Sequence, residues 1–123
     1  MSPPRSSSSQ IMEENLKKAV IEMLVMLLLD EEDMYSIQIT QTLEERSDET
    51  LNLSCPYALL YRLIESGYIR EAYKKIAPDG RRRQYYQITE EGQQYLGTLL
   101  TTYRRFNENM ERLMKGGKKR DGQ

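Results

Sequence analysis

The chain has 123 residues and a net charge of −1, with 38% hydrophobic and 30% charged residues. These values predict one globular domain, because this is a common domain length and the apolar fraction is too high for a chain disordered throughout. The sequence has no histidine and one cysteine, which excludes a Ser-His-Asp triad, a Cys/His metal site and an internal disulfide. We expect no enzyme, no cofactor and no metal. With no apolar run of about 18 residues, we expect a cytoplasmic protein without a membrane span.

The charge is unevenly distributed along the chain. Residues 13–53 carry eleven acidic and three basic side chains, a net charge of −8. Residues 60–86 carry seven basic and three acidic side chains, a net charge of +4. A basic region attracts polyanions, so the second segment is either a nucleic-acid contact or a solvated hairpin with spare bases. Charge alone favours neither interpretation.

Both ends of the chain are expected to lack fixed structure. Residues 2–9 contain no apolar side chain, and residues 116–123 consist of glycine and polar residues. Such segments bury too little apolar surface to offset the entropy lost on ordering. We therefore predict a disordered arm over 1–9 and a flexible tail over 116–123.

The first predicted helix covers about residues 10–29. Its apolar side chains recur at intervals of three and four, which marks one buried helix face. They are Leu16, Val20, Met23, Leu24, Leu27 and Leu28. Four consecutive acids at 30–33 are expected to end this helix, because negative charge opposes the dipole at a helix C-terminus.

Two shorter helices are predicted next. The first spans about residues 36–46, where two apolar side chains lie one turn apart. The second begins at 54–55, because Pro56 is tolerated only in a first helical turn. Gly67 is expected to end it as a left-handed cap.

A β-hairpin and a last helix complete the chain. Residues 68–76 and 84–88 are rich in tyrosine and isoleucine and predict two strands. The sequence Pro78-Asp79-Gly80 between them predicts a turn, because proline presets φ and glycine supplies a positive φ. Thr89 then caps a final helix over 90–115, whose first turn holds two glutamates where negative charge is favourable.

The last helix carries an apolar seam with the heptad spacing of a coiled coil. Its members alternate at three and four residues: Leu96, Leu99, Tyr103, Phe106, Met110 and Leu113. Three helices and a hairpin already close a small core, so without a partner this seam would be an exposed apolar patch. We therefore predict a homodimer formed through residues 90–115. The alternative is a helix packed on its own domain.

This order of elements predicts a winged helix-turn-helix over residues 10–89, three helices plus a β-hairpin wing. The chain is thus α+β, mostly α, with a long C-terminal dimerisation helix. In such folds the third helix lies in the major groove of DNA and the hairpin contacts phosphates. Tyr57 and Tyr61 lie one turn apart and off the buried stripe, and arginine pairs well with phosphate. The candidate DNA-contacting residues are Ser36, Ser54, Cys55, Tyr57, Tyr61, Lys74, Lys75, Arg81, Arg82 and Arg83.

Two segments resemble the PadR-like family of bacterial transcriptional regulators. They are YALLYRLIESGYI at 57–69 and GRRRQYYQITEEG at 80–92. The resemblance covers about residues 14–114 and implies a homodimeric, usually repressing regulator, joined through the C-terminal helix and often the first. It also implies that Tyr57 contacts the DNA backbone, that the wing arginines bind DNA, and that flat aromatic compounds bind some short members near the position of Tyr103.

The chain departs from the family pattern at the start of two helices. Ser36 stands where the family has glycine. The run 54–56, Ser-Cys-Pro, precedes Tyr57 where the family usually has Gly-Thr/Ser-aliphatic. These are positions where bases would be contacted, so the family's operator sequences do not transfer to this chain.

We therefore expect a DNA-binding transcriptional regulator. Its expected partners are a second copy, a double-stranded DNA operator, and a small hydrophobic or aromatic ligand in a slot lined by the seam. The alternative is a winged-helix protein-interaction module that does not bind DNA, and the arginine triplet argues against it. Arg62 either reaches DNA or, as we favour, pairs with Glu65 or an acid of the first helix. Cys55 is either a redox-sensing thiolate or, as we favour, a small residue that fits a first helical turn.

Overall fold

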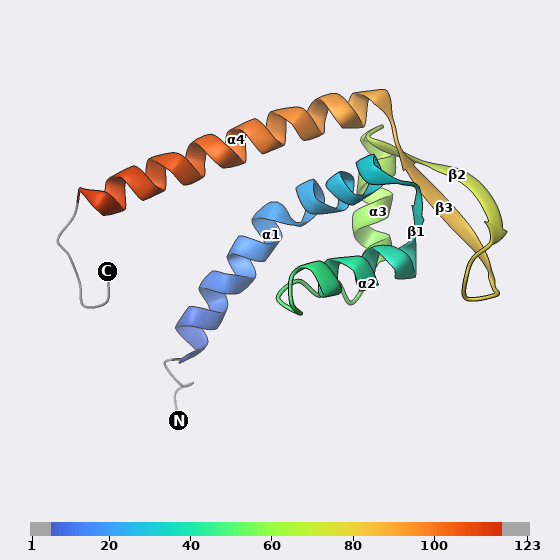
Figure 1. Ribbon diagram of the computed structural model, residues 1–123, viewed down its shortest axis with the longest axis horizontal. Coiled ribbons are helices and arrows are strands. Elements are labelled where there is room, and N and C mark those ends of the chain that lie inside the picture. The colour runs from blue at the N-terminus through green and yellow to red at the C-terminus, as the bar shows by residue number, and fades with distance from the viewer. Residues whose placement is uncertain (1–5, 117–123) are drawn as a thin grey trace.

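The computed structural model describes residues 6–116 (Figure 1). Its elements are α1 (Ser6–Glu31), β1 (Met34–Tyr35), α2 (Ser36–Arg46), α3 (Pro56–Glu65), β2 (Ile69–Ile76), β3 (Arg82–Ile88) and α4 (Glu90–Lys115). The predicted winged helix-turn-helix with a long C-terminal helix is confirmed. Most of the arm and tail, residues 1–5 and 117–123, lies outside the described part. In residues 6–116, no helix is both long enough and apolar enough to cross a bilayer.

The first helix is longer than predicted at both ends. It begins at Ser6, so residues 6–9 of the predicted arm are helical, and it runs on to Glu31. Adding a residue to an existing helix gains one hydrogen bond without a new nucleus, which explains the extension at the start. At the other end, Glu31 Oε2 accepts a bond from Arg46 Nη1 at 2.8 Å, and this cation offsets the unfavourable acid at the helix terminus.

The sheet contains a third strand that the sequence pattern did not predict. β1 pairs antiparallel with β3, which gives the strand order β1-β3-β2. It holds the Tyr35 ring edge to face against Tyr85, with centroids 5.3 Å apart. A strand of two residues is too short to show an alternating pattern.

Two glycines adopt the positive φ predicted for them, one at the end of α3 and one in the turn of the wing. Gly67 has φ +82°, and the backbone N–H groups of Gly67 and Tyr68 donate to the carbonyls of Ile64 and Leu63 at 2.9 and 3.0 Å, the Schellman cap of a helix. Gly80 has φ +85° and donates to the Ala77 carbonyl at 2.8 Å. The second arrangement makes the tight turn of the wing.

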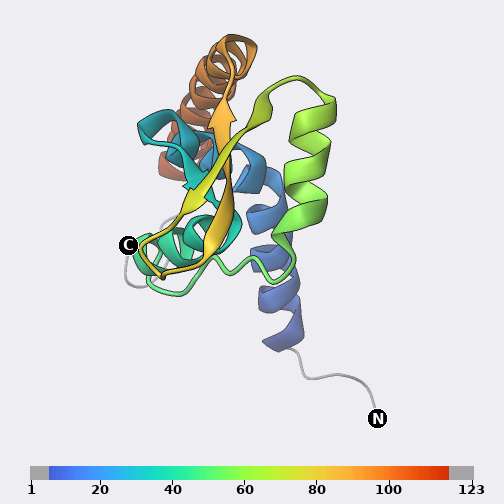
Figure 2. The same ribbon diagram turned by 90° about the vertical axis from the view of Figure 1, so that its right-hand side faces the viewer.

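The core lies between the buried half of α1, the helices α2 and α3, and the base of the sheet. Its most deeply buried large side chains are Met26, Ile39, Leu60, Leu63, Ile69 and Val25. Because α3 packs here through its leucines, its opposite face is left to solvent, and α3 lies beside β2 (Figure 2).

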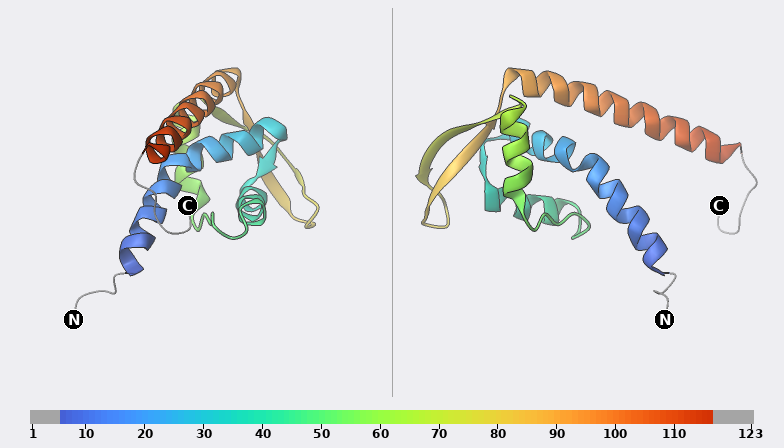
Figure 3. Two further views of the ribbon diagram at one scale, coloured as in Figure 1. Left: turned by 60° about the vertical axis from the view of Figure 1, so that its left-hand side comes forward. Right: turned by 180° about the vertical axis from the view of Figure 1, so that it is seen from behind.

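The last helix is attached to this core through its first turns. Thr89 Oγ1 accepts a hydrogen bond from the Gly92 N–H at 3.0 Å, the predicted cap. A Cβ at Gly92 would lie 2.0 Å from the Tyr68 carbonyl oxygen, so only glycine fits. Farther along, every side chain from Thr101 to Asn109 is exposed. Most of α4 therefore extends away from the domain (Figure 3).

Candidate nucleic-acid interface

The exposed face of α3 carries two aromatic side chains. Tyr57 and Tyr61, one turn apart, are 60% and 64% exposed. Ser54 and Cys55, just before the helix, are exposed as well, with Pro56 in the first turn. Four of the predicted contact residues therefore lie together at the start of α3.

Ser36 does not share this surface. It is only 7% exposed, and its Oγ donates a hydrogen bond to Tyr57 Oη at 3.1 Å. The prediction that Ser36 contacts DNA is therefore corrected, because a buried hydroxyl bound to a neighbour is not available to a phosphate. Its observed role is to hold the Tyr57 phenol.

Arg62 pairs with the first helix. Its Nη2 and Nε donate to Glu22 Oε1 at 2.9 and 3.2 Å, which ties α3 to α1. Of the two interpretations of Arg62, the ion pair with an acid of the first helix is confirmed. The arginine is largely exposed, so the pair contributes little stability.

The strand register divides the basic residues of the wing between its two faces. Directly opposed residues of antiparallel strands point to the same side, and the register pairs Lys74 with Gln84, Lys75 with Arg83, and Ile76 with Arg82. We call the side that holds Lys74, Ile76 and Arg82 the open wing face. We call the other side, with Tyr73, Lys75, Arg83 and Tyr85, the tyrosine wing face.

The two cations of the tyrosine wing face are engaged within the wing. Arg83 Nη2 lies 2.7 Å from Asp79 Oδ2, and this bond lowers the pKa of Asp79 and raises that of Arg83. Lys75 Nζ lies 4.6 Å from the ring centre of Tyr85, a cation–π contact. Arg83 is therefore bound to Asp79, whereas Arg81 and Arg82 are exposed at the tip. That all three arginines contact DNA stays a prediction.

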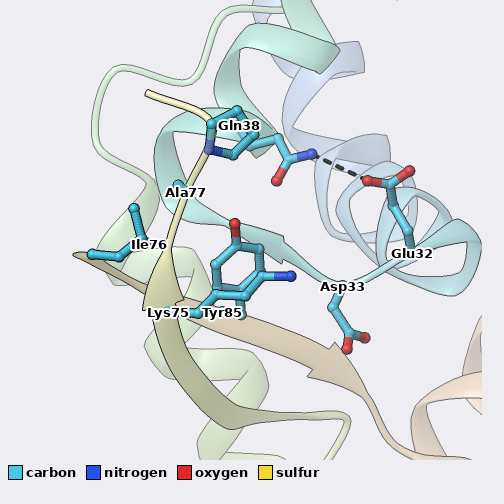
Figure 4. Close-up of a pocket in the computed structure, with 8 residues that line it drawn as sticks. Glu32, Asp33, Gln38, Lys75, Ile76, Ala77 and Tyr85 are labelled. Carbon is cyan, nitrogen blue, oxygen red and sulfur yellow. Dashed lines mark hydrogen bonds between the residues drawn. The ribbon is translucent and has the colours of Figure 1, made fainter. Parts of the chain in front are cut away.

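A hollow of about 430 Å³ lies between the tyrosine wing face and the junction of α1 with β1 (Figure 4). Beside it, Asp33 Oδ2 accepts hydrogen bonds from Tyr73 Oη at 2.7 Å and from Gln87 Nε2 at 3.2 Å. The bond to Asp33 raises the pKa of Tyr73. These bonds tie the wing to the end of α1, a link that sequence analysis missed because the partners are 40 and 54 residues apart.

The predicted seam of α4 is only partly available to a partner. Leu96 is 3% exposed in the core of its own domain, so its assignment to an intermolecular slot is corrected. The reason is the close contact of Gly92 with Tyr68, which brings the first turns of α4 onto the domain. Leu99 is partly buried against the same core and Met110 is partly buried. Tyr103, Phe106 and Leu113 are exposed.

The first half of α1 is a second exposed apolar surface. Ile11, Met12 and Leu16 are each more than half exposed, which differs from the prediction that Leu16 is buried. α1 and α4 touch near the domain and then diverge (Figures 1 and 3). The exposed apolar side chains of both helices therefore lie on parts of the chain that extend beyond its own core.

Known proteins are similar to this chain in sequence and in fold. The model of the "Transcriptional regulator PadR-like family" matches residues 25–98. An uncharacterised protein of Lysinibacillus sphaericus is 30% identical over 98 residues, which are 78% of this chain and 89% of that protein. A PadR family transcription regulator from hypervirulent Clostridium difficile R20291 is 28% identical, with a TM-score of 0.68 over 77% of this chain and 98% of that chain. A PadR-like transcriptional regulator from Bacillus cereus ATCC 14579 shares the fold, with a TM-score of 0.74 at 21% identity over 84% of this chain and 99% of that one.

Proposed function

The chain belongs to the PadR-like family of transcriptional regulators, and from this premise we propose that it acts as a homodimeric repressor that responds to a small aromatic ligand. Membership of this family makes it a DNA-binding regulator and not an enzyme. We further propose that each copy places α3 in the major groove of one operator half-site. The two half-sites would lie about one helical turn apart.

One observation carries this proposal: α3 presents two largely exposed tyrosines, and the wing carries the exposed cations Lys74, Arg81 and Arg82. Tyr86 of β3 is buried in the same core cluster as the leucines of α3, which holds the wing and this helix in one domain. Phenol hydroxyls and basic side chains position a protein on phosphates. Tyr57, Lys74 and Arg81 are therefore assigned to the DNA backbone, and Tyr61 to the groove itself.

The exposed apolar halves of α1 and α4 support a symmetric dimer. Two α4 helices packed together would bury Tyr103, Phe106 and Leu113, each twice, because a twofold interface uses the same surface of both copies. Ile11 and Leu16, exposed on the first half of α1, would extend this interface where the partner also covers that helix. An apolar surface of this length suits a helical partner with the same heptad spacing.

The ligand proposal rests on the same seam. Between two copies, Leu99, Tyr103, Phe106 and Met110 would line a slot with few charges, which suits a flat, hydrophobic molecule. Such a ligand relieves repression if it binds the DNA-free geometry more tightly. A tenfold loss of DNA affinity requires about 1.4 kcal/mol of coupling.

The direct test is selection of bound duplexes from a random library by the purified full chain, followed by a transcription assay on the selected site. We expect a pseudo-palindromic motif and reduced transcription. Tyr61→Ala should weaken binding at least about tenfold, whereas Glu108→Ala on the exposed part of α4 should leave it unchanged. No enriched motif, together with equal binding by Tyr61→Ala, would support the protein-interaction module instead.

A further inference from the structure

The hollow beside the tyrosine wing face is lined by a buried phenol. Tyr85 is only 5% exposed and packs in a cluster with Tyr35 and Ala77, yet it lines the hollow of about 430 Å³. Figure 4 shows its hydroxyl pointing into the group of residues around the hollow. Within residues 6–116 this hydroxyl has no hydrogen-bond partner, whereas every fully buried side-chain oxygen there has one. The Tyr85 oxygen therefore opens onto the hollow, where it can donate and accept hydrogen bonds.

Charged groups of opposite sign line the two sides of the hollow. Lys75 belongs to β2 of the wing, whereas Glu32 and Asp33 lie between α1 and β1. The Lys75 ammonium lies 4.6 Å from the ring centre of Tyr85, and this contact with the ring face uses no hydrogen-bond acceptor. Gln38 Nε2 donates to Glu32 Oε1 at 3.2 Å and holds that carboxylate beside the hollow. One side thus offers N–H donors and the other offers carboxylates.

This lining favours a molecule that carries both charges. An anion alone, including a DNA phosphate, would be repelled by the two carboxylates. A cation alone would meet Lys75, which already covers the aromatic ring that would otherwise attract it. Ala77 and Pro78 add an apolar wall, and the volume lies at the small end of the range for ligand sites, roughly 300–1,000 Å³. A small zwitterion with an apolar part matches all of these features.

We propose that the hollow binds a free α-amino acid with an apolar side chain. Its carboxylate pairs with Lys75 and accepts a hydrogen bond from the Tyr85 hydroxyl. Its ammonium pairs with Glu32, and its side chain lies on Ala77 and Pro78. Because the two sides of the hollow belong to different elements, the bound amino acid bridges the wing and the end of α1. The site lies within one copy and is separate from the slot proposed between two α4 helices.

The experiment titrates the isotope-labelled full chain with L-leucine and follows the backbone amides by NMR. Two matched probes each lack one charge of leucine: 4-methylpentanoate lacks the ammonium, and 3-methylbutylamine lacks the carboxylate. We expect leucine to bind with a dissociation constant of about 1 mM or tighter. Each probe should bind about tenfold more weakly, because it loses one charge-assisted hydrogen-bonding group. The largest shifts should lie at residues 75–78 and at Tyr85.

Three variants assign the charges and the hydroxyl to their partners. Tyr85→Phe removes only the hydroxyl and should weaken leucine binding at least about threefold. Lys75→Gln should make leucine and 3-methylbutylamine bind equally, because the carboxylate loses its partner. Glu32→Gln should do the same for leucine and 4-methylpentanoate, because the ammonium loses its partner. Lys74→Gln, which removes the same charge as Lys75→Gln but from the open wing face, should leave all three affinities unchanged.

Several outcomes would overturn the inference. No binding of L-valine, L-leucine or L-phenylalanine at about 10 mM would do so and leave the proposed function intact, because DNA binding does not require this hollow. Leucine binding without binding to any duplex would instead overturn the proposed function alone. Equal binding of leucine and 4-methylpentanoate by the unaltered chain would exclude a site for the ammonium. Leucine binding that Tyr103→Ala abolishes would place the amino acid between the α4 helices. If a variant at the hollow does not fold, as circular dichroism would show, the three probes on the unaltered chain decide.

Discussion

The hydroxyl of Ser36 donates a hydrogen bond to the phenol oxygen of Tyr57, which joins the first residue of α2 to the first turn of α3. The serine is buried and the tyrosine is largely exposed, so a fixed group holds a side chain that faces solvent. Glycine, which occupies this position in the family pattern, has no hydroxyl to form the bond. This chain therefore orders an aromatic side chain, before any DNA binds, on the surface that we propose contacts DNA.

Replacing Ser36 tests how much the ordering of the Tyr57 side chain contributes to stability and to DNA binding. Ser36→Ala should lower the free energy of unfolding by about 1 kcal/mol, the usual net value of one hydrogen bond. It should also weaken DNA binding a few-fold, because the phenol must then be ordered on binding. Chemical denaturation and fluorescence anisotropy measure the two effects. In a Tyr57→Phe background, Ser36→Ala should have no further effect on binding; fully additive losses would contradict the coupling.

The two faces of the wing should differ in their contribution to salt dependence. Neutralising Lys74 and Arg82 of the open wing face with glutamine should reduce the slope of log affinity against log salt by about 0.9 per lost phosphate contact. The matched pair, Lys75→Gln with Arg83→Gln, removes the same charge and should change the slope much less, because these side chains are engaged within the wing. Equal slopes for the two double variants would show that both faces contact phosphate.

The dimer should depend on side chains that the single domain does not use. Phe106 and Leu113 are 59% and 70% exposed, so Phe106→Ser with Leu113→Ser should leave the fold intact. In a dimer each truncation of a buried side chain removes roughly 2–5 kcal/mol, and each occurs twice. Sedimentation at micromolar concentration should show a monomer. Thr102→Ser with Glu108→Ser, outside the seam, is the control. A dimer that survives in the first variant would place the interface elsewhere.

The wing turn should respond to pH through Asp79. The guanidinium of Arg83 holds the pKa of this carboxyl below its usual value, with help from the backbone N–H of Arg81. Because the folded pKa is lowered, the ionised carboxylate stabilises the turn above the unfolded pKa, and this contribution is lost as pH falls through the lowered value. A carbon NMR titration should show the low pKa, and Arg83→Gln should return it towards about 3.9. An unaltered pKa in that variant would mean that the pair does not form in solution.

The proposed slot should bind flat aromatic molecules. Planar aromatic probes should quench tyrosine fluorescence with dissociation constants of about 100 µM or tighter, roughly −5.5 kcal/mol. Tyr103→Ala should abolish this binding because it removes an aromatic wall of the slot, whereas Tyr61→Ala on the proposed DNA-contacting surface should retain it. Binding that persists in Tyr103→Ala would make the dimer helix purely structural.

Single residues with strong local preferences made the boundaries of α3 and the start of α4 predictable. Pro56 and Gly67 bracket α3, and Thr89 starts α4, because each acts through its own backbone or its own capping bond. β1 was not predictable, since its two residues become a strand only by pairing with Tyr85 and Tyr86 of β3. Its existence depends on a contact some 50 residues away along the chain.

The location of the candidate site was predictable from the sequence. How its basic residues divide between the two faces of the wing was not. Residues 81–83 appear in the sequence as one basic cluster, and only the strand register separates Arg82 from Arg83. That register depends on the length of the turn and on the irregular pairing between Glu71 and Tyr73. Likewise, Leu96 fits the heptad spacing, and only the docking of α4 on the domain places it in the core.

The contact between Gly92 and the Tyr68 carbonyl also limits how the regulator can move. Backbone lies against backbone where α4 leaves the domain, so we expect α4 and α3 to turn as one rigid body. α4 has 26 residues, a length of about 39 Å. If it pivots at its far end, a tilt of about 5° moves the domain by roughly 3.4 Å, the rise of one base pair. The angle between the two α4 helices would then set the number of base pairs between half-sites. A ligand that opened this angle slightly would displace each α3 by one base pair relative to its half-site.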